Sequence, residues 1–221
     1  MSDLPGHGKD PWSLERRRRE ADALVDAAHV DQARLLYAAM LDDHRTALGV
    51  DHPATLEVLA NLAWCNETLH AFPPALGQYT ELHQRCLALL GEEHDDTLSA
   101  QRGLMNATGA VRGADSARLI GYALVGTLVR TRGPAHEHTW EAARAYAHWL
   151  WLAGRGGEAR DLYAHLYHAL PEHHPVRDVM AAEYDRHRRE ISRPRRMNRL
   201  PDHIRRYSRY TQQQWRDGYI D

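Results

Sequence analysis

The sequence predicts an all-α protein, a solenoid of four helical hairpins followed by a C-terminal capping helix and a basic tail. A linker motif returns at a fixed spacing of 42 residues. Small, aromatic and aliphatic residues keep the same spacing at helical intervals inside each unit. No stretch shows the alternating pattern of a β-strand. A fixed period of this size is typical of a repeat array, in which each unit packs only on its neighbours.

The linker motif predicts the start of a helix in each unit. Pro11 and Pro53 suit a first helical position, where a missing N–H costs no hydrogen bond. Acidic residues follow in the first turns, where they face the positive end of the helix dipole. In chain order, the copies of the motif are 10–14, 49–56, 91–98, 133–140 and a degraded copy at 171–175.

The second helix of each unit keeps its own register. An alanine is followed four residues later by an aromatic residue, and three residues after that by an aliphatic one, which places all three on one helical face. The third unit has Gly121 in the aromatic position. The register consists of Ala33, Ala75, Ala117 and Ala159, then Tyr37, Tyr79 and Tyr163, then Met40, Leu82, Leu124 and Leu166.

These patterns predict nine helices, separated by breaks that contain Gly, Pro or polar residues. The ninth helix is expected to cap the stack. The predicted ranges are 12–28, 31–47, 54–70, 74–89, 96–111, 115–130, 138–153, 157–168 and 175–190.

The repeats resemble tetratricopeptide repeats of the long, 42-residue subtype found in kinesin light chains. The resemblance covers about residues 10–190, and it weakens at two places: His70 stands where a glycine is usual between paired helices, and Gly121 stands where an aromatic residue is usual. It rests on Leu48-Gly49, Asp51-His52-Pro53, Thr55-Leu56, Asn61-Leu62-Ala63, Ala75 and Tyr79, with their copies.

The resemblance implies a superhelix whose concave groove, lined by the first helix of each pair, holds a segment of a partner protein. We therefore expect a non-enzymatic adaptor for protein–protein interaction, with no cofactor. Arginine can clamp a carboxylate, asparagine can bond an extended backbone, and tryptophan offers a flat anchor. The alternative is a solvated face with local ion pairs. The expected groove residues are Arg18, Asn61, Trp64, Arg102, Asn106, Arg144, His148, Trp151, Arg186 and Arg189.

Other chemistries have weaker support in the sequence. The sixteen histidines raise the question of a metal site, but zinc needs three or four converging ligands, and many of these histidines belong to the linker, where a cap or packing role explains them. No catalytic motif with a nucleophile and a base can be named. We therefore expect neither a metal site nor an enzyme.

Residues 191–221 are an Arg- and aromatic-rich tail, and we expect residues 1–9 to be a loose lead-in. The window 186–209 holds ten arginines and two acidic residues, although the whole chain carries only −2. We expect Ile204, Tyr207 and Trp215 to contact protein, either this chain or another copy in a homo-oligomer. The alternative function is a regulatory or accessory protein that contacts nucleic acid through this tail.

Two further features bear on location. Cys65 and Cys86 fall inside predicted helices, where buried thiols fit a reducing compartment. The N-terminus has no apolar core of signal-peptide length, and no apolar run is long enough to span a bilayer. We therefore expect a cytoplasmic protein without a membrane partner.

Overall fold

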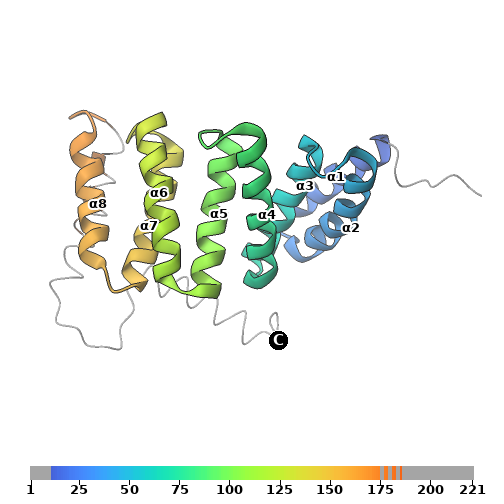
Figure 1. Cartoon of the computed structure of the whole chain (residues 1–221), viewed down its shortest axis with the longest axis horizontal. Helices are drawn as coiled ribbons and strands as arrows, with labels where there is room; N and C mark the ends of the chain where they lie inside the picture. The colour runs from blue at the N-terminus through green and yellow to red at the C-terminus, as the bar shows by residue number, and fades with distance from the viewer. Residues whose placement is uncertain (1–10, 175–176, 179–180, 183–184, 186–221) are drawn as a thin grey trace, which may run out of the picture. The chain divides into compact units, whose positions relative to one another are not determined.

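The computed structural model describes residues 11–174, 177–178, 181–182 and 185, and every element in this part of the chain is an α-helix (Figure 1). Each of the first eight predicted helices is present, with ends within two residues of the prediction. The all-α prediction is confirmed. The predicted ninth helix lies mostly outside the described residues. The helices are α1 (Pro11–Asp26), α2 (Val30–Leu48), α3 (Pro53–Thr68), α4 (Phe72–Leu90), α5 (Asp95–Arg112), α6 (Ala114–Arg132), α7 (Glu137–Leu152) and α8 (Gly156–Ala169).

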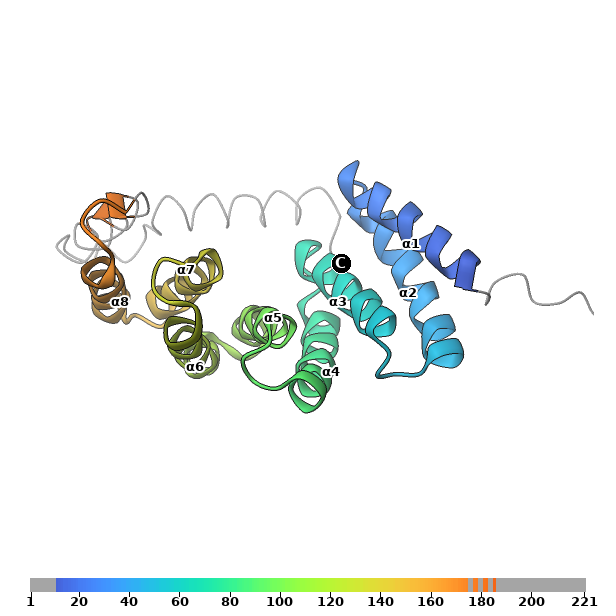
Figure 2. The same ribbon diagram turned by 90° about the horizontal axis from the view of Figure 1, so that it is seen from above.

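The chain divides into two compact units, Met1–Ala107 and Thr108–Asp221, and α5 runs across the division. In the first unit α1 packs on α2, α2 on α3, and α3 on α4. In the second unit α6 packs on α7, and α7 on α8. Figure 2 shows the helices of each unit from above, with consecutive helices as neighbours. Each helix therefore buries its apolar side against the helices next to it in sequence, as a repeat array requires.

The repeated linker works as a helix cap. The Nδ1 atoms of His52, His94 and His136 each accept a hydrogen bond from the backbone N–H two residues later, at 3.2 Å in all three linkers. An N-cap acceptor of this kind satisfies one of the N–H groups that have no partner inside the helix. The expectation that a cap role explains the linker histidines is confirmed for these three.

A threonine anchors the same linker from inside the helix. The hydroxyl groups of Thr55 and Thr139 donate to the carbonyl oxygens of Gly49 and Gly133, each at 2.8 Å. Both threonines are buried. The two glycines have φ near +90°, which is a region that other residues rarely adopt. In these two linkers the Gly-x-x-His-x-x-Thr pattern therefore fixes how one hairpin enters the next. In the linker between them the buried Thr97 hydroxyl has no hydrogen-bond partner among the described residues.

The core follows the register predicted for the second helices. Their four alanines are fully buried, and the tyrosine and aliphatic positions are buried as well. Cys65 and Cys86 are free thiols inside this core, and burial raises the pKa of Cys65 to about 11. Thiols of this kind are packing residues rather than nucleophiles.

The turns inside the hairpins deviate from the expected glycine pattern. Ala28 and His70 have φ of +61° and +57°, in the position that Gly154 fills with φ +74°. In all three turns the next backbone N–H bonds a carbonyl five residues earlier, as in a Schellman motif. In the third unit α5 extends to Arg112, so Gly113 takes the positive φ one residue later. The turns at Ala28 and His70 therefore keep the backbone conformation of the turn at Gly154, although neither residue is a glycine.

Candidate functional site

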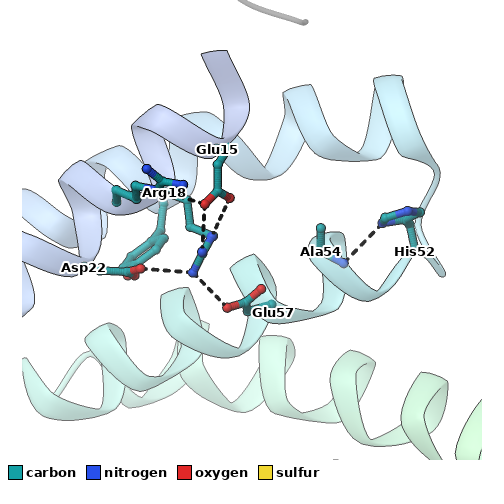
Figure 3. A network of polar contacts seen from close by, with 8 residues as sticks. Glu15, Arg18, Asp22, His52, Ala54 and Glu57 are labelled. Atoms are coloured by element: carbon teal, nitrogen blue, oxygen red, sulfur yellow. Dashed lines mark hydrogen bonds and ion pairs between the residues drawn. The ribbon is translucent and has the colours of Figure 1, made fainter. Parts of the chain in front are cut away.

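The side of α1 and α3 that faces away from their apolar contacts carries a network of charges centred on Arg18. The guanidinium donates to both carboxylate oxygens of Glu15 at 3.1 Å, and its Nη1 donates to Asp22 at 3.1 Å and to Glu57 at 3.2 Å. Figure 3 shows the three carboxylates pointing toward Arg18, with Glu57 coming from the neighbouring helix α3. One arginine therefore bridges three acidic side chains from two repeats.

This network shows how the first helices of successive units are aligned. Glu57 stands 42 residues after Glu15, at the same position of the next repeat. The Arg18–Glu57 bond therefore joins the same face of two successive first helices. Hydrogen bonds from Arg18, and then from Arg19, hold the pKa of Glu15 below its ordinary value. We call the surface formed by Glu15, Arg18, Asp22, Glu57 and Trp64 the first-helix face.

Trp64 gives the first-helix face its apolar part. It lies seven residues after Glu57 on α3, two helical turns along the same side, and 42% of its surface is exposed. Asn61 lies between them and is half-buried. The Glu57 side chain is 50% exposed although it is bonded to Arg18. An exposed tryptophan beside polar groups is typical of anchor residues at protein interfaces.

A second network, centred on Glu67, lies at the end of α3. The Tyr79 hydroxyl donates to one oxygen of Glu67 at 2.7 Å, and the Asn106 amide donates to the other at 2.8 Å. Burial, together with the charge of Glu67, raises the pKa of the Tyr79 hydroxyl, which therefore stays a donor. The network ties α3, α4 and α5 together inside the first unit. Asn106 is thus engaged in holding the fold.

The expected residues of the second unit lie on α7. Arg144 is exposed, and its guanidinium carbon lies 5.8 Å from the centre of the Trp140 ring. His148 and Trp151 are half-buried, and the His148 ring packs edge-on against Trp149 at 5.2 Å between ring centres. The equivalent face of α7 therefore combines one exposed cation with aromatic side chains.

The structure places the expected groove residues in different surroundings. Within the first unit Arg18 and Trp64 lie on the first-helix face, Asn61 lies between Glu57 and Trp64 on α3, and Arg102 is half-buried on α5. That these residues bind a partner stays a prediction. Several expected residues fall outside the described part of the chain: Arg186 and Arg189 of the capping helix, and Ile204, Tyr207 and Trp215 of the tail.

Glu67 and two glycines of α5 are residues that the sequence did not single out. A β-carbon on Gly103 would lie 2.2 Å from Cε1 of Tyr79, and one on Gly109 would lie 2.5 Å from the ring of Trp149. The aromatic partner precedes one glycine by 24 residues and follows the other by 40, so the repeat period offers no signal for either contact.

Two properties of the described residues complete the description of the site. They contain no group of three or more His, Cys, Asp or Glu side chains that could hold a metal ion. None of the helices in this part of the chain has the length and apolarity to cross a membrane.

Comparison with known proteins identifies the fold. No protein-family model and no curated protein matches the sequence. The structure is similar to that of a protein from Podosopora anserina assigned as a kinesin light chain with nearly identical TPR-like repeats: the TM-score is 0.72 at 19% identity, over 82% of this chain and 88% of that one. A variant of that protein with a glutamine replaced by methionine also gives 0.72 at 19% identity, over 90% and 96% of the two chains.

A third similar structure is BtubC (BKLC) from P. vanneervenii, with a TM-score of 0.60 at 15% identity over 85% of this chain and 86% of that one. At these identities the likeness concerns the fold. Repeats of this kind generally mediate protein–protein interaction through their extended surfaces. The chain therefore has a tetratricopeptide-like repeat fold, as its 42-residue period and its eight described helices indicate.

Proposed function

We propose that this chain is a non-enzymatic adaptor that holds a segment of a partner protein against the first helices of its repeats. The observation that carries the proposal is the first-helix face, where an exposed tryptophan stands among polar side chains aligned from one repeat to the next. The linker histidines cap helices, and Thr55 and Thr139 bond linker carbonyls, so the motif that repeats most clearly has a structural task. The side chains on this side of α1 and α3 differ from one repeat to the next, for example Asp22 and Trp64, and they are the part of the repeat that we assign to binding.

The fold supports this choice over an enzyme. Tetratricopeptide-like repeats typically bind proteins and do not catalyse reactions. The carboxylates around Arg18 are each ion-paired with it, and Glu67 is bonded by Tyr79 and Asn106. Neither network presents a nucleophile next to a base. We also propose a cytoplasmic protein, since buried, unpaired cysteines suit a reducing compartment.

Affinity capture from the native host, compared between matched variants, tests the adaptor function. Proteins recovered by the wild type should be lost with Trp64→Ala, because truncating a central aromatic anchor typically costs about 2 kcal/mol or more of binding. They should remain with Leu119→Ala, which removes a 65% exposed apolar side chain from α6. Recovery of the same proteins by both variants would remove the first-helix face from the function.

A second candidate function is contact with nucleic acid through the tail, favoured by the ten arginines of residues 186–209 together with the aromatic residues Tyr207, Tyr210, Trp215 and Tyr219. Cutting the chain after Arg189 distinguishes the two functions. If the tail contacts protein, the shortened chain should lose stability or change its mass in light scattering. If the tail binds nucleic acid, mass and stability should stay unchanged, and only a salt-dependent shift of DNA or RNA in a gel should vanish.

A further inference from the structure

The net negative charge of the described residues lies in the first unit, which contains the first-helix face. Residues 11–107 contain fifteen acidic residues and eight arginines, a net charge of −7, whereas residues 108–174 contain six acidic residues and seven arginines, a net charge of +1. A net field of this size selects partners by sign and steers their approach. The first unit is therefore suited to a cationic partner.

The contacts of Arg18 also favour a cationic partner. This side chain is only 27% exposed, and its guanidinium is already bonded to Glu15, Asp22 and Glu57. It is therefore poorly placed to clamp a carboxylate of a partner, which is the role that an arginine in a peptide groove would suggest. Arg19 also donates to Glu15, and the Tyr37 hydroxyl donates to Asp22. Three carboxylates therefore face two guanidinium groups, and Glu57 is half exposed to solvent. The surface therefore holds both guanidinium groups with its own carboxylates and keeps a net negative charge.

Trp64 supplies the second element of recognition. It stands on the same side of α3 as Glu57 and is 42% exposed. A cation over the face of a tryptophan is attracted by the ring, and among the aromatic side chains tryptophan gives the strongest such contact. An arginine or lysine side chain could thus stack on Trp64 and reach the Glu57 carboxylate.

We propose that the first-helix face binds a basic segment of a partner protein, with an arginine or lysine of that segment placed on Trp64 beside Glu57. This inference rests on the proposed adaptor function and specifies the chemistry of its partner. An acidic segment would meet the excess of carboxylates and be repelled.

The test uses the full-length chain at low salt and two labelled peptides of equal length, one alternating arginine with alanine and the other alternating glutamate with alanine. The arginine peptide should bind and the glutamate peptide should not. Trp64→Ala and Glu57→Gln should each weaken binding of the arginine peptide by roughly five-fold or more. Arg18→Gln should tighten it, because the substitution removes one positive charge and frees Glu57 from its bond to Arg18. Circular dichroism confirms that each variant is folded.

Matched controls exclude general charge attraction. Glu172→Gln removes an exposed carboxylate from the second unit, and Leu119→Ala removes an exposed apolar side chain there. Both should bind like the wild type. The proposal is overturned if the glutamate peptide binds as well as the arginine peptide, or if Glu172→Gln weakens binding as much as Glu57→Gln. It is equally overturned if Arg18→Gln weakens binding.

The basic tail of the chain itself is a rival occupant. Replacing Arg193, Arg195 and Arg196 by glutamate in the full chain should leave the affinity for the arginine peptide unchanged. A rise of roughly ten-fold would show that the tail occupies the face, and would overturn the assignment to an external partner. Absence of peptide binding, alongside captured proteins that still depend on Trp64, would reject the basic chemistry and leave the adaptor function standing.

Discussion

The ring of Tyr79 occupies the space in which a side chain of residue 103 would begin: a β-carbon built on Gly103 would lie 2.2 Å from Cε1 and 2.3 Å from Cζ of that tyrosine. The tyrosine is buried, and its hydroxyl is fixed by Glu67. The ring therefore cannot swing aside without breaking a hydrogen bond. Gly103 is the feature of α5 that lets α4 pack closely against it.

Gly103→Ala should destabilise the protein by roughly 1–3 kcal/mol or more, because it overpacks this joint. Gly77→Ala is the matched control, since a β-carbon there meets nothing within 4 Å and alanine favours the helix by about 0.5–1 kcal/mol. Urea unfolding of the two variants measures the difference. Equal stability of Gly103→Ala and the wild type would show that Tyr79 does not pack there.

His52→Ala should lower the free energy of unfolding by about 1 kcal/mol, since the Ala54 N–H at the start of α3 loses its cap. His52→Asn should retain most of the stability, because asparagine is also a good N-cap acceptor. Thermal unfolding of the pair separates the cap from other roles of the imidazole. If the two variants melt together, well below the wild type, the ring acts by packing and the cap contributes little.

Ala28→Gly should stabilise the protein by about 0.5–1 kcal/mol, because alanine at φ +61° carries a strain that glycine avoids. Ala27→Gly is the neighbouring control, at a residue whose φ is not positive, and it should destabilise. Gly154→Ala should destabilise for the converse reason, since φ there is +74°. Chemical unfolding of all three gives the comparison, and a loss of stability in Ala28→Gly would contradict the turn geometry.

Arg102→Ala combined with Arg144→Ala should leave the affinity for a basic partner segment unchanged or raise it, because a cationic segment gains nothing from these two positive charges. The free energy of unfolding should change by no more than about 0.5 kcal/mol for each exposed site. Arg144 is exposed and Arg102 is half-buried, so the larger stability effect is expected at Arg102. Calorimetry with a captured partner, alongside thermal melting, separates binding from folding. Weaker binding in the double variant would show that these arginines hold an acidic group of the partner, and would contradict the basic chemistry.

The sequence was most informative at positions where every repeat has the same physical requirement. Each linker needs a cap and each second helix needs a small residue at its closest approach, so His52, His94 and His136, like the four alanines, recur at 42 residues. The helix ends follow from these positions. Polar contacts between helices do not recur in this way: Tyr37 donates to Asp22, 15 residues earlier, whereas Tyr79 donates to Glu67, 12 residues earlier.

The first-helix face could be predicted as a set of residues but not as a network. Helical spacing placed Glu15, Arg18 and Asp22 on one side of α1. The bond from Arg18 to Glu57 depends on how α1 lies beside α3, and that angle is set by side-chain packing in the core. A periodic pattern carries no information about this angle. From the sequence alone, Arg18 could therefore be either available to a partner or ion-paired within its own chain.

Hydrogen–deuterium exchange of the full-length protein, with and without a captured partner, tests the central claim most directly, because first and second helices alternate along the chain and are separated by proteolysis. Binding at the first-helix face should slow exchange in α1 and α3, at and around Glu57 and Trp64, and leave the exposed surface of α2 at Leu35 unchanged. Protection confined to α2, α4 and α6, with none in α1 or α3, would contradict the account.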